Sequence, residues 1–231
     1  MDATVVLLHS PLVGPGTWAG VAAELAARGH RVVVPDLRVA PAPPPWWPVA
    51  VESAAAPPAG TTEVVLVPHS NAGLLTPAVT ERREARGVRV RACVFVDAAL
   101  PGPSGTAPLG APQLMPLLRE LAVDGWLPPW TGWWDAEDVA RLLPDPAVRR
   151  AVTAEEPRLP LAYFEQRVPV PAGWDARPCA YLWFGGAYDD DAARAVARGW
   201  PARRLPGGHL HALVDPAAVA GAVVDLAGLR G

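Results

Sequence analysis

The sequence predicts one α/β domain built around a parallel sheet. Short apolar runs rich in β-branched residues recur along the chain, and alanine-rich segments of helical period separate them. This alternation is typical of parallel strands joined by crossover helices. A length of 231 residues gives room for one such domain with a sizeable core. We therefore expect a mostly parallel central sheet of about six strands, flanked by helices.

The expected elements alternate along the chain. Six short apolar runs are the expected strands: Thr4–His9, Arg31–Pro35, Glu63–Pro68, Ala92–Asp97, Ala180–Phe184 and Ala202–Leu205. Four segments of helical period are the expected helices: Trp18–Arg28, Asn71–Arg86, Asp190–Arg198 and Pro216–Leu226. Asp190 and Asp191 suit the first turn of the third helix, because the helix dipole favours negative charge there.

Two stretches interrupt this pattern. The first, Pro41-Ala42-Pro43-Pro44-Pro45-Trp46-Trp47-Pro48, is expected to be a stiff loop. The second, Pro101–Asp175, is a long insert with proline, tryptophan and short helical patches. An insert of this length between two strands is usually functional, most often as a lid. We expect residues 1–100 and 176–231 to form the core and residues 101–175 to form a Trp/Pro-rich lid.

Composition excludes several classes of function. The formal net charge is -3 and no basic stripe is present, so we expect no nucleic-acid partner. All basic residues are arginine, and the absence of lysine excludes Schiff-base chemistry, a pyridoxal linkage and a P-loop lysine. No run is long enough to span a membrane, and the N-terminus does not resemble a signal peptide. We expect a small-molecule substrate, no metal and no cofactor.

The two cysteines carry a prediction about the compartment. Cys93 and Cys179 each lie in an expected buried strand. Two such cysteines fit buried free thiols better than a disulfide framework or a metal cluster. A reducing cytoplasm is therefore the expected location.

The strongest functional signal is the run Val64-Val65-Leu66-Val67-Pro68-His69-Ser70-Asn71-Ala72-Gly73. It predicts a strand, a sharp turn and the start of a helix, with Ser70 at the apex. A nucleophilic serine needs this geometry, because the turn lifts its hydroxyl above the sheet and the helix start points N–H groups at it. A serine that only caps a helix would explain the residue type. It would not explain the histidine found further along.

That histidine is His209, in the run Pro206-Gly207-Gly208-His209 after the last expected strand. Open parallel sheets bind ligands at the ends of their strands, so His209 can reach Ser70 there. It can take the serine proton as a general base and return it to a leaving group. His211 is the weaker candidate, with packing or solvation on the same loop as its alternative role.

Several motifs in the same order resemble a known family. They are Val5-Val6-Leu7-Leu8-His9-Ser10-Pro11, Thr17-Trp18, Gly29-His30-Arg31-Val32-Val33-Val34-Pro35-Asp36-Leu37, the serine turn, Val94-Phe95-Val96-Asp97-Ala98-Ala99-Leu100-Pro101 and Gly207-Gly208-His209. Together they cover nearly the whole chain. It resembles the α/β-hydrolase fold superfamily and, within it, the small esterase, methylesterase and hydroxynitrile-lyase-like group. The resemblance implies a serine, histidine and acid site, with the family's N-terminal hairpin missing.

The sequence departs from this family at the oxyanion hole. The resemblance implies that one oxyanion donor is the N–H of Asn71, the residue after the nucleophile. The second donor maps to Pro11, which has no N–H. Either the N–H of Leu12 or the hydroxyl of Ser10 replaces it, or the protein does not stabilise an acyl oxyanion.

The acid of the site has also moved. Alignment on Pro178 places Ala187 at the family's usual acid position, and carboxylates begin only at Asp189. Asp97 occupies an alternative position, which resembles that of the dehalogenase-like members. We favour Asp97 over Asp189, because the acid must reach the imidazole N–H to hold its tautomer.

Tryptophans mark the expected lid and the proline-rich loop. Trp126, Trp130, Trp133 and Trp134 lie in the lid, and Trp46 and Trp47 lie in the loop. If both segments cover the strand ends, they form an aromatic wall for a bulky, apolar substrate, with Trp133 and Trp134 as binding residues. Alternatively, the tryptophans form the lid's own core.

Three functions remain open from the sequence. The first is a serine hydrolase that acts on an ester, lactone or thioester of a hydrophobic small molecule. The second is a non-hydrolytic enzyme of the same fold, such as a lyase, cyclase or C–C bond-forming catalyst, in which Ser70 and His209 relay protons. The third is a ligand-binding protein, against which the Ser70 and His209 pair argues.

Overall fold

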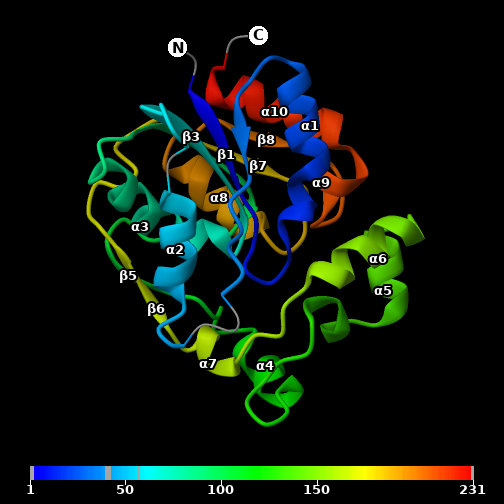
Figure 1. Cartoon of the computed structure of the whole chain (residues 1–231). Helices are drawn as coiled ribbons and strands as arrows, with labels where there is room; N and C mark the ends of the chain where they lie inside the picture. Colours follow the sequence, from blue (N-terminus) through cyan, green and yellow to red (C-terminus); the bar gives the residue numbers. More distant parts are fainter. Residues whose placement is uncertain (1–2, 40–42, 57, 230–231) are drawn as a thin grey trace.

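A six-stranded parallel sheet forms the centre of the computed structural model, which describes residues 3–39, 43–56 and 58–229 (Figure 1). The strand order is β2-β1-β3-β4-β7-β8. The bounds are Thr4–Leu8 for β1, Val32–Val33 for β2, Glu63–Ser70 for β3, Arg89–Ala98 for β4, Cys179–Trp183 for β7 and Ala202–Arg204 for β8. A separate antiparallel pair joins β5, Gly105–Pro108, to β6, Arg167–Val170.

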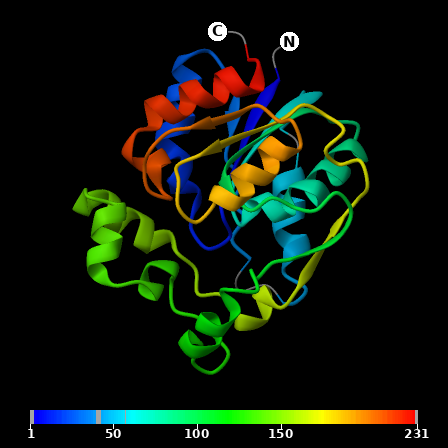
Figure 2. The ribbon, with the colours of Figure 1, turned by 180° about the vertical axis from the view of Figure 1, so that it is seen from behind.

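Helices cover both faces of the sheet, as Figures 1 and 2 show. The helices that pack on the core are α1 Ala19–Ala27, α2 Trp47–Ala55, α3 Ala72–Glu84, α8 Asp189–Ala197 and α10 Pro216–Ala227. Alternate residues of β1 enter different clusters: Val5 and Leu7 pack with α1 and α10, whereas Val6 and Leu8 pack with α2 and α3. Because both faces are buried at the centre of the sheet, strands such as β1 and β7 are near-continuous apolar runs.

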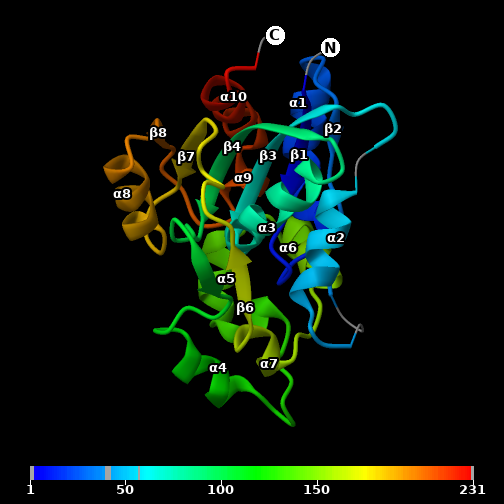
Figure 3. The ribbon, with the colours of Figure 1, turned by 90° about the vertical axis from the view of Figure 1, so that its left-hand side faces the viewer.

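The segment 101–175 leaves the sheet after β4 and returns to it at β7. It contains β5, β6 and the short elements α4 Met115–Leu121, η2 Trp130–Trp133, α5 Ala136–Leu142, α6 Pro146–Glu155 and α7 Leu161–Phe164. Figure 3 shows α4 and α7 beyond the end of the sheet that lies away from the two termini. This is the end at which the parallel strands finish; η1 Pro15–Trp18 follows β1 and contacts both α6 and α9 His211–Val214.

The predicted fold class is confirmed, including the six strands and the four predicted helices. The expected proline-rich loop is partly wrong. Pro41 and Ala42 lie outside the described residues, but Trp47 and Pro48 begin helix α2. Proline is favoured in the first turn of a helix, where its missing N–H costs no hydrogen bond.

Candidate active site

Ser70 lies at a sharp turn between β3 and α3. Its φ of 57° is in the left-handed region, which a residue other than glycine adopts only where the surrounding structure forces it. Gly73 lets α3 approach the end of β4, since a Cβ there would lie 2.1 Å from the Ala99 carbonyl oxygen. The Ala99 N–H donates to the Ser70 carbonyl oxygen at 3.1 Å. Close packing of α3 on β4 therefore holds the strained turn.

His209 and Asp97 form a hydrogen-bonded pair. The Nδ1–H of His209 donates to Asp97 Oδ2 at 2.7 Å, and the Asp97 side chain is only 1% exposed. The other carboxylate oxygen accepts the Phe184 N–H at 3.0 Å. Because both carboxylate oxygens are engaged, Asp97 fixes the imidazole in the tautomer that leaves Nε2 as the basic nitrogen.

Two aromatic rings stack on His209. The ring of His69 lies 4.5 Å away at 24°, and the ring of Tyr188 lies 5.1 Å away at 22°. The Nε2–H of His69 also donates to the His209 carbonyl oxygen at 2.9 Å. Burial, with a smaller effect of His209, holds the pKa of His69 well below its usual value. His69 is therefore a neutral donor that fixes the histidine loop.

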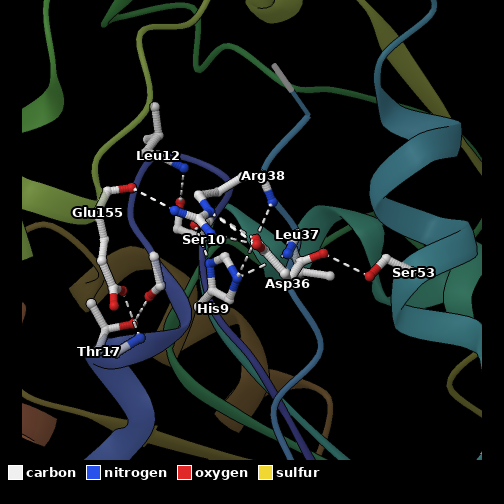
Figure 4. A network of polar contacts seen from close by, with 11 residues as sticks. His9, Ser10, Leu12, Thr17, Asp36, Leu37, Arg38, Ser53 and Glu155 are labelled. Carbon is white, nitrogen blue, oxygen red and sulfur yellow. Dashed lines mark hydrogen bonds and ion pairs between the residues drawn. The ribbon is translucent and has the colours of Figure 1, made fainter. Parts of the chain in front are cut away.

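The loop after β1 is organised around Ser10 (Figure 4). The Leu12 N–H donates to Ser10 Oγ at 3.3 Å, and the Val13 N–H donates to the Ser10 carbonyl oxygen at 3.1 Å. Pro11 has no N–H. Leu12 and Val13 therefore use their N–H groups within the turn. Ser10 itself is buried and does not line the cavity described below.

His9 fixes the same loop to the chain after β2. The Leu37 N–H donates to His9 Nε2 at 2.9 Å, so the proton of the ring lies on Nδ1, which donates to the Ser10 carbonyl oxygen at 2.8 Å. Burial is the largest effect on the pKa of His9 and lowers it, although Asp36 lies 3.6 Å from Nε2. The imidazole is thus neutral, and its contact with Asp36 is not an ion pair.

Glu155, at the end of α6, joins segment 101–175 to the loop after β1 (Figure 4). Its Oε2 accepts the Gly16 N–H at 2.8 Å. A Cβ at Gly14 would lie 2.1 Å from the same oxygen, so glycine is required for this close approach. Arg38 donates to the Glu155 carbonyl oxygen at 3.4 Å.

Asn71 ties the same segment to the serine turn. Its Nδ2 donates to the Leu109 carbonyl oxygen at 2.9 Å, and its Oδ1 accepts the Tyr163 hydroxyl at 2.9 Å. Both polar groups of the side chain are thus engaged with residues of segment 101–175. The side chain is structural here, and the backbone N–H of Asn71 is what lies at the start of α3.

A cavity of about 890 Å³ brings these groups together. Ser70, His209 and Tyr188 line it from the core, and Leu12 lines it from the loop after β1. Most of the other lining side chains are apolar. Trp130, Trp133 and Trp134 line it from segment 101–175, so the two expected binding tryptophans both face the cavity.

The aromatic wall is smaller than expected from the sequence. Trp46 and Trp47 do not line the cavity. Their backbone N–H groups donate to Gln166 Oε1 at 3.1 and 3.5 Å, and their side chains pack on the core. Trp126 is also absent from the lining and is 42% exposed. The expectation that both segments build one wall is therefore wrong for these three residues.

Comparisons with known proteins rest on structure. No family model matches the chain, and no curated protein sequence matches it. An extracellular α/β-hydrolase from a Paenibacillus species is similar to it, with a TM-score of 0.73, 17% identity, and coverage of 97% of this chain and 98% of that one. The chain adopts the α/β-hydrolase fold. Polyneuridine aldehyde esterase has the same fold at a TM-score of 0.72, with 14% identity over 97% of this chain and 99% of that chain.

Tomato methylketone synthase I is a further neighbour within the α/β-hydrolase fold. Its TM-score is 0.74, with 15% identity over 99% of this chain and 98% of that chain. All three sequence identities are low, so these similarities show the fold of this chain and not its reaction.

The structure separates the two candidate acids of this α/β-hydrolase fold. Asp97 bonds to His209, whereas Asp189 is exposed in the first turn of α8, where its Oδ2 accepts the Gly186 N–H at 3.2 Å. No hydrogen bond joins Asp189 to His209 in the described part of the chain. The acidic run at Asp189 thus serves the start of a helix, as helix dipoles favour. His211 packs edge-on against Phe184, 5.3 Å away.

Tyr188 was missed by the reasoning from sequence. Its hydroxyl lies 3.2 Å from Ser70 Oγ, and its ring stacks on His209. The available signal was the Gly185-Gly186 pair, which predicts a tight turn after a strand and brings the next residues back to the site. Both glycines adopt positive φ, 111° and 75°.

Within residues 3–39, 43–56 and 58–229, no group of three or more His, Cys, Asp or Glu side chains is placed to hold a metal ion. No helix in those ranges combines the length and apolarity needed to cross a bilayer.

Proposed function

We propose that this protein is a serine hydrolase that cleaves an ester, lactone or thioester of a bulky hydrophobic small molecule. One observation carries the proposal: the strained Ser70 lines the same apolar cavity as His209, which is hydrogen-bonded to the buried Asp97. A nucleophile, a base and a group that orients the base are the parts that acyl transfer requires. The neighbouring esterase of the same fold is consistent with this reaction.

The residues would act in a fixed order. Ser70 Oγ attacks the carbonyl carbon while its proton passes to His209 Nε2, and Asp97 stabilises the imidazolium that forms. The C–O or C–S bond then breaks, and His209 returns the proton to the leaving group. Water attacks the acyl-enzyme, His209 takes its proton, and Ser70 leaves with that proton.

The hydroxyl of Ser70 must turn before this attack. In the structure Ser70 Oγ bonds to Tyr188 and not to His209. Catalytic hydrogen bonds are often loose without substrate and tighten when it binds. Segment 101–175 would act as a cap that excludes water and holds the apolar part of the substrate against Trp130, Trp133 and Trp134.

A fluorophosphonate probe tests the proposal directly. We expect stoichiometric labelling of the wild-type protein and none of Ser70→Ala, because the probe reacts with an activated serine. Ser104→Ala is the matched control, since Ser104 is exposed in segment 101–175 and lines no part of the cavity, and it should label fully. A folded wild-type protein that resists the probe would contradict the proposal.

A second function is favoured by the loop after β1. Pro11 has no N–H, and those of Leu12 and Val13 donate to Ser10, so this loop presents no oxyanion donor. A non-hydrolytic proton relay through Ser70 and His209 needs no such donor. One structural neighbour is named a methylketone synthase, so proteins of this fold are not all named esterases. Turnover in hydroxylamine separates the two functions, because an acyl-enzyme yields hydroxamate faster than the substrate does without enzyme, whereas a proton relay does not.

A further inference from the structure

We propose that the Tyr188 hydroxyl is a catalytic hydrogen-bond donor that binds the oxyanion formed beside Ser70, in place of the N–H that Pro11 lacks. This inference rests on the proposed acyl transfer and names the group that completes its oxyanion site. The family pattern places that donor on the loop after β1, whereas here it comes from the loop between β7 and α8.

The position of the hydroxyl supports this role. Tyr188 Oη lies 3.2 Å from Ser70 Oγ, and Tyr188 lines the cavity. In a tetrahedral intermediate only one carbon atom separates Ser70 Oγ from the oxyanion. A donor that already reaches Oγ can therefore bond to the oxyanion after a small movement. Preorganised donors at roughly 2.7–3.1 Å from that oxygen are what stabilise such intermediates.

The ring of Tyr188 is fixed in place. It stacks on His209 at 5.1 Å and 22°, and His209 is held in turn by Asp97 and His69. A rigid ring keeps the hydroxyl oriented, so little reorganisation is needed when charge develops. Packing on His209 alone would explain an aromatic residue here. It would not explain a hydroxyl directed at the nucleophile.

The hydroxyl keeps its proton at neutral pH. Burial is the largest effect and raises the pKa of Tyr188, and the nearby carboxylates of Asp97 and Asp191 raise it further. The hydrogen bond with Ser70 acts in the opposite direction but does not reverse the shift. Tyr188 is thus a neutral donor, which suits binding of an anionic oxygen and excludes a role as a phenolate base.

The loop after β1 cannot supply this hydrogen bond as it stands. The N–H groups of Leu12 and Val13 donate to Ser10, and Pro11 has none. The loop after β7 can supply the donor. It does not have to supply the acid at residue 187, because Asp97 of β4 bonds to His209. Gly185 and Gly186, both at positive φ, turn the chain so that Tyr188 reaches the site.

Tyr188→Phe tests the inference, because it removes the hydroxyl and keeps the stacked ring. On an ester that the wild-type protein hydrolyses, we expect kcat to fall roughly 10²- to 10³-fold with KM little changed. The fluorophosphonate should still label Ser70, since Ser70, His209 and Asp97 remain, but more slowly than in the wild-type protein, because the donor to the phosphonyl oxygen is lost. Unchanged kcat in this variant would overturn the inference and leave the proposed hydrolase intact. A wild-type protein without hydrolysis would overturn both.

Fluorinated tyrosines at position 188 test the hydroxyl without relying on Phe to fold. At a pH where the hydroxyl stays protonated, a more acidic phenol is a stronger donor, so kcat should rise as fluorine is added. A flat series would show that the hydroxyl only packs. A crystal structure of the phosphonylated enzyme gives a third readout. We expect Tyr188 Oη to contact the phosphonyl oxygen, and a contact from Leu12 N–H with Tyr188 turned away would overturn the inference.

Discussion

The ends of β4 and β7 lie side by side but carry different chemistry. These strands pair in parallel, with Val96 opposite Leu182. The end of β4 presents the Asp97 carboxylate to His209, and the chain after β7 presents the Tyr188 hydroxyl to Ser70. The two ends also contact each other, since the Phe184 N–H bonds to Asp97. Two neighbouring strand ends can therefore serve the same histidine, and the fold does not dictate which of them supplies the acid.

The division of work at these ends has a physical basis. Both loops lie within reach of the imidazole, but only one carboxylate is needed to hold its tautomer. Once Asp97 takes that role, a second carboxylate at the position of Tyr188 would add like charge near the first. A neutral hydroxyl avoids that repulsion and adds a donor. The variants below separate the contributions of the two ends.

Asp97→Asn should give the largest effect. The amide cannot hold His209 in the reactive tautomer, and comparable changes in serine hydrolases lower kcat by roughly 10⁴-fold. The rate of ester hydrolysis measures this loss. Asp189→Asn is the matched control at the end of the β7 loop, and we expect it to change the rate by less than about twofold, as exposed substitutions do. A large loss in Asp189→Asn with little loss in Asp97→Asn would reverse the roles assigned to the two ends.

Gly73→Ala should disturb the β4 end and the Ser70 turn that packs against it. The new Cβ would meet the Ala99 carbonyl oxygen, a backbone atom that cannot move freely, so we expect a loss of roughly 1–3 kcal/mol in the free energy of unfolding. Thermal or denaturant unfolding measures it. Gly221→Ala is the control in helix α10, where no atom lies within 4 Å of the added Cβ. That variant should gain up to about 1 kcal/mol from helix propensity.

The smallest effect concerns the third contact on His209, which comes from His69. Burial lowers the pKa of both His9 and His69 in the folded protein, whereas the unfolded chain titrates near about 6.5. Below that pH the unfolded state binds more protons, so the free energy of unfolding should decrease as the pH falls. Denaturant titrations from pH 7 to 5 measure the slope. His69→Gln keeps a hydrogen-bond donor and should make the free energy of unfolding depend less steeply on pH. An equally steep dependence would show that His69 does not cause the effect.

The sequence predicted the parts of the site that depend on local patterns. Ser70 follows from a strand, turn and helix within ten residues, and His209 follows from a glycine pair after a strand. Asp97 was favoured over Asp189 by strand-end position, and the structure pairs it with His209. The fold was predicted for a similar reason, because most of the strands are local apolar runs.

Tyr188 and the tryptophan wall depend instead on contacts between distant segments. Tyr188 and Ser70 are 118 positions apart, and no periodicity relates them. Trp46 and Trp47 were misplaced because Pro48 was interpreted as part of a loop, whereas it starts α2. The sequence left open whether the Leu12 N–H or the Ser10 hydroxyl replaces the missing oxyanion donor, because that depends on how the loop turns. In the structure the Leu12 N–H donates to Ser10 Oγ.

The hydrogen bonds of Asn71 and of Glu155 between segment 101–175 and the core would constrain how the proposed substrate can enter. Asn71 holds Leu109 and Tyr163, and Glu155 holds Gly16. A swing of the whole segment would break all of these bonds and pull on the residue next to the nucleophile. Opening that is confined to the stretch between these bonds breaks none of them. For the proposed hydrolase, substrate would therefore enter most easily by a local movement around Trp130 and Trp134, which leaves the bonds of Asn71 and Glu155 in place.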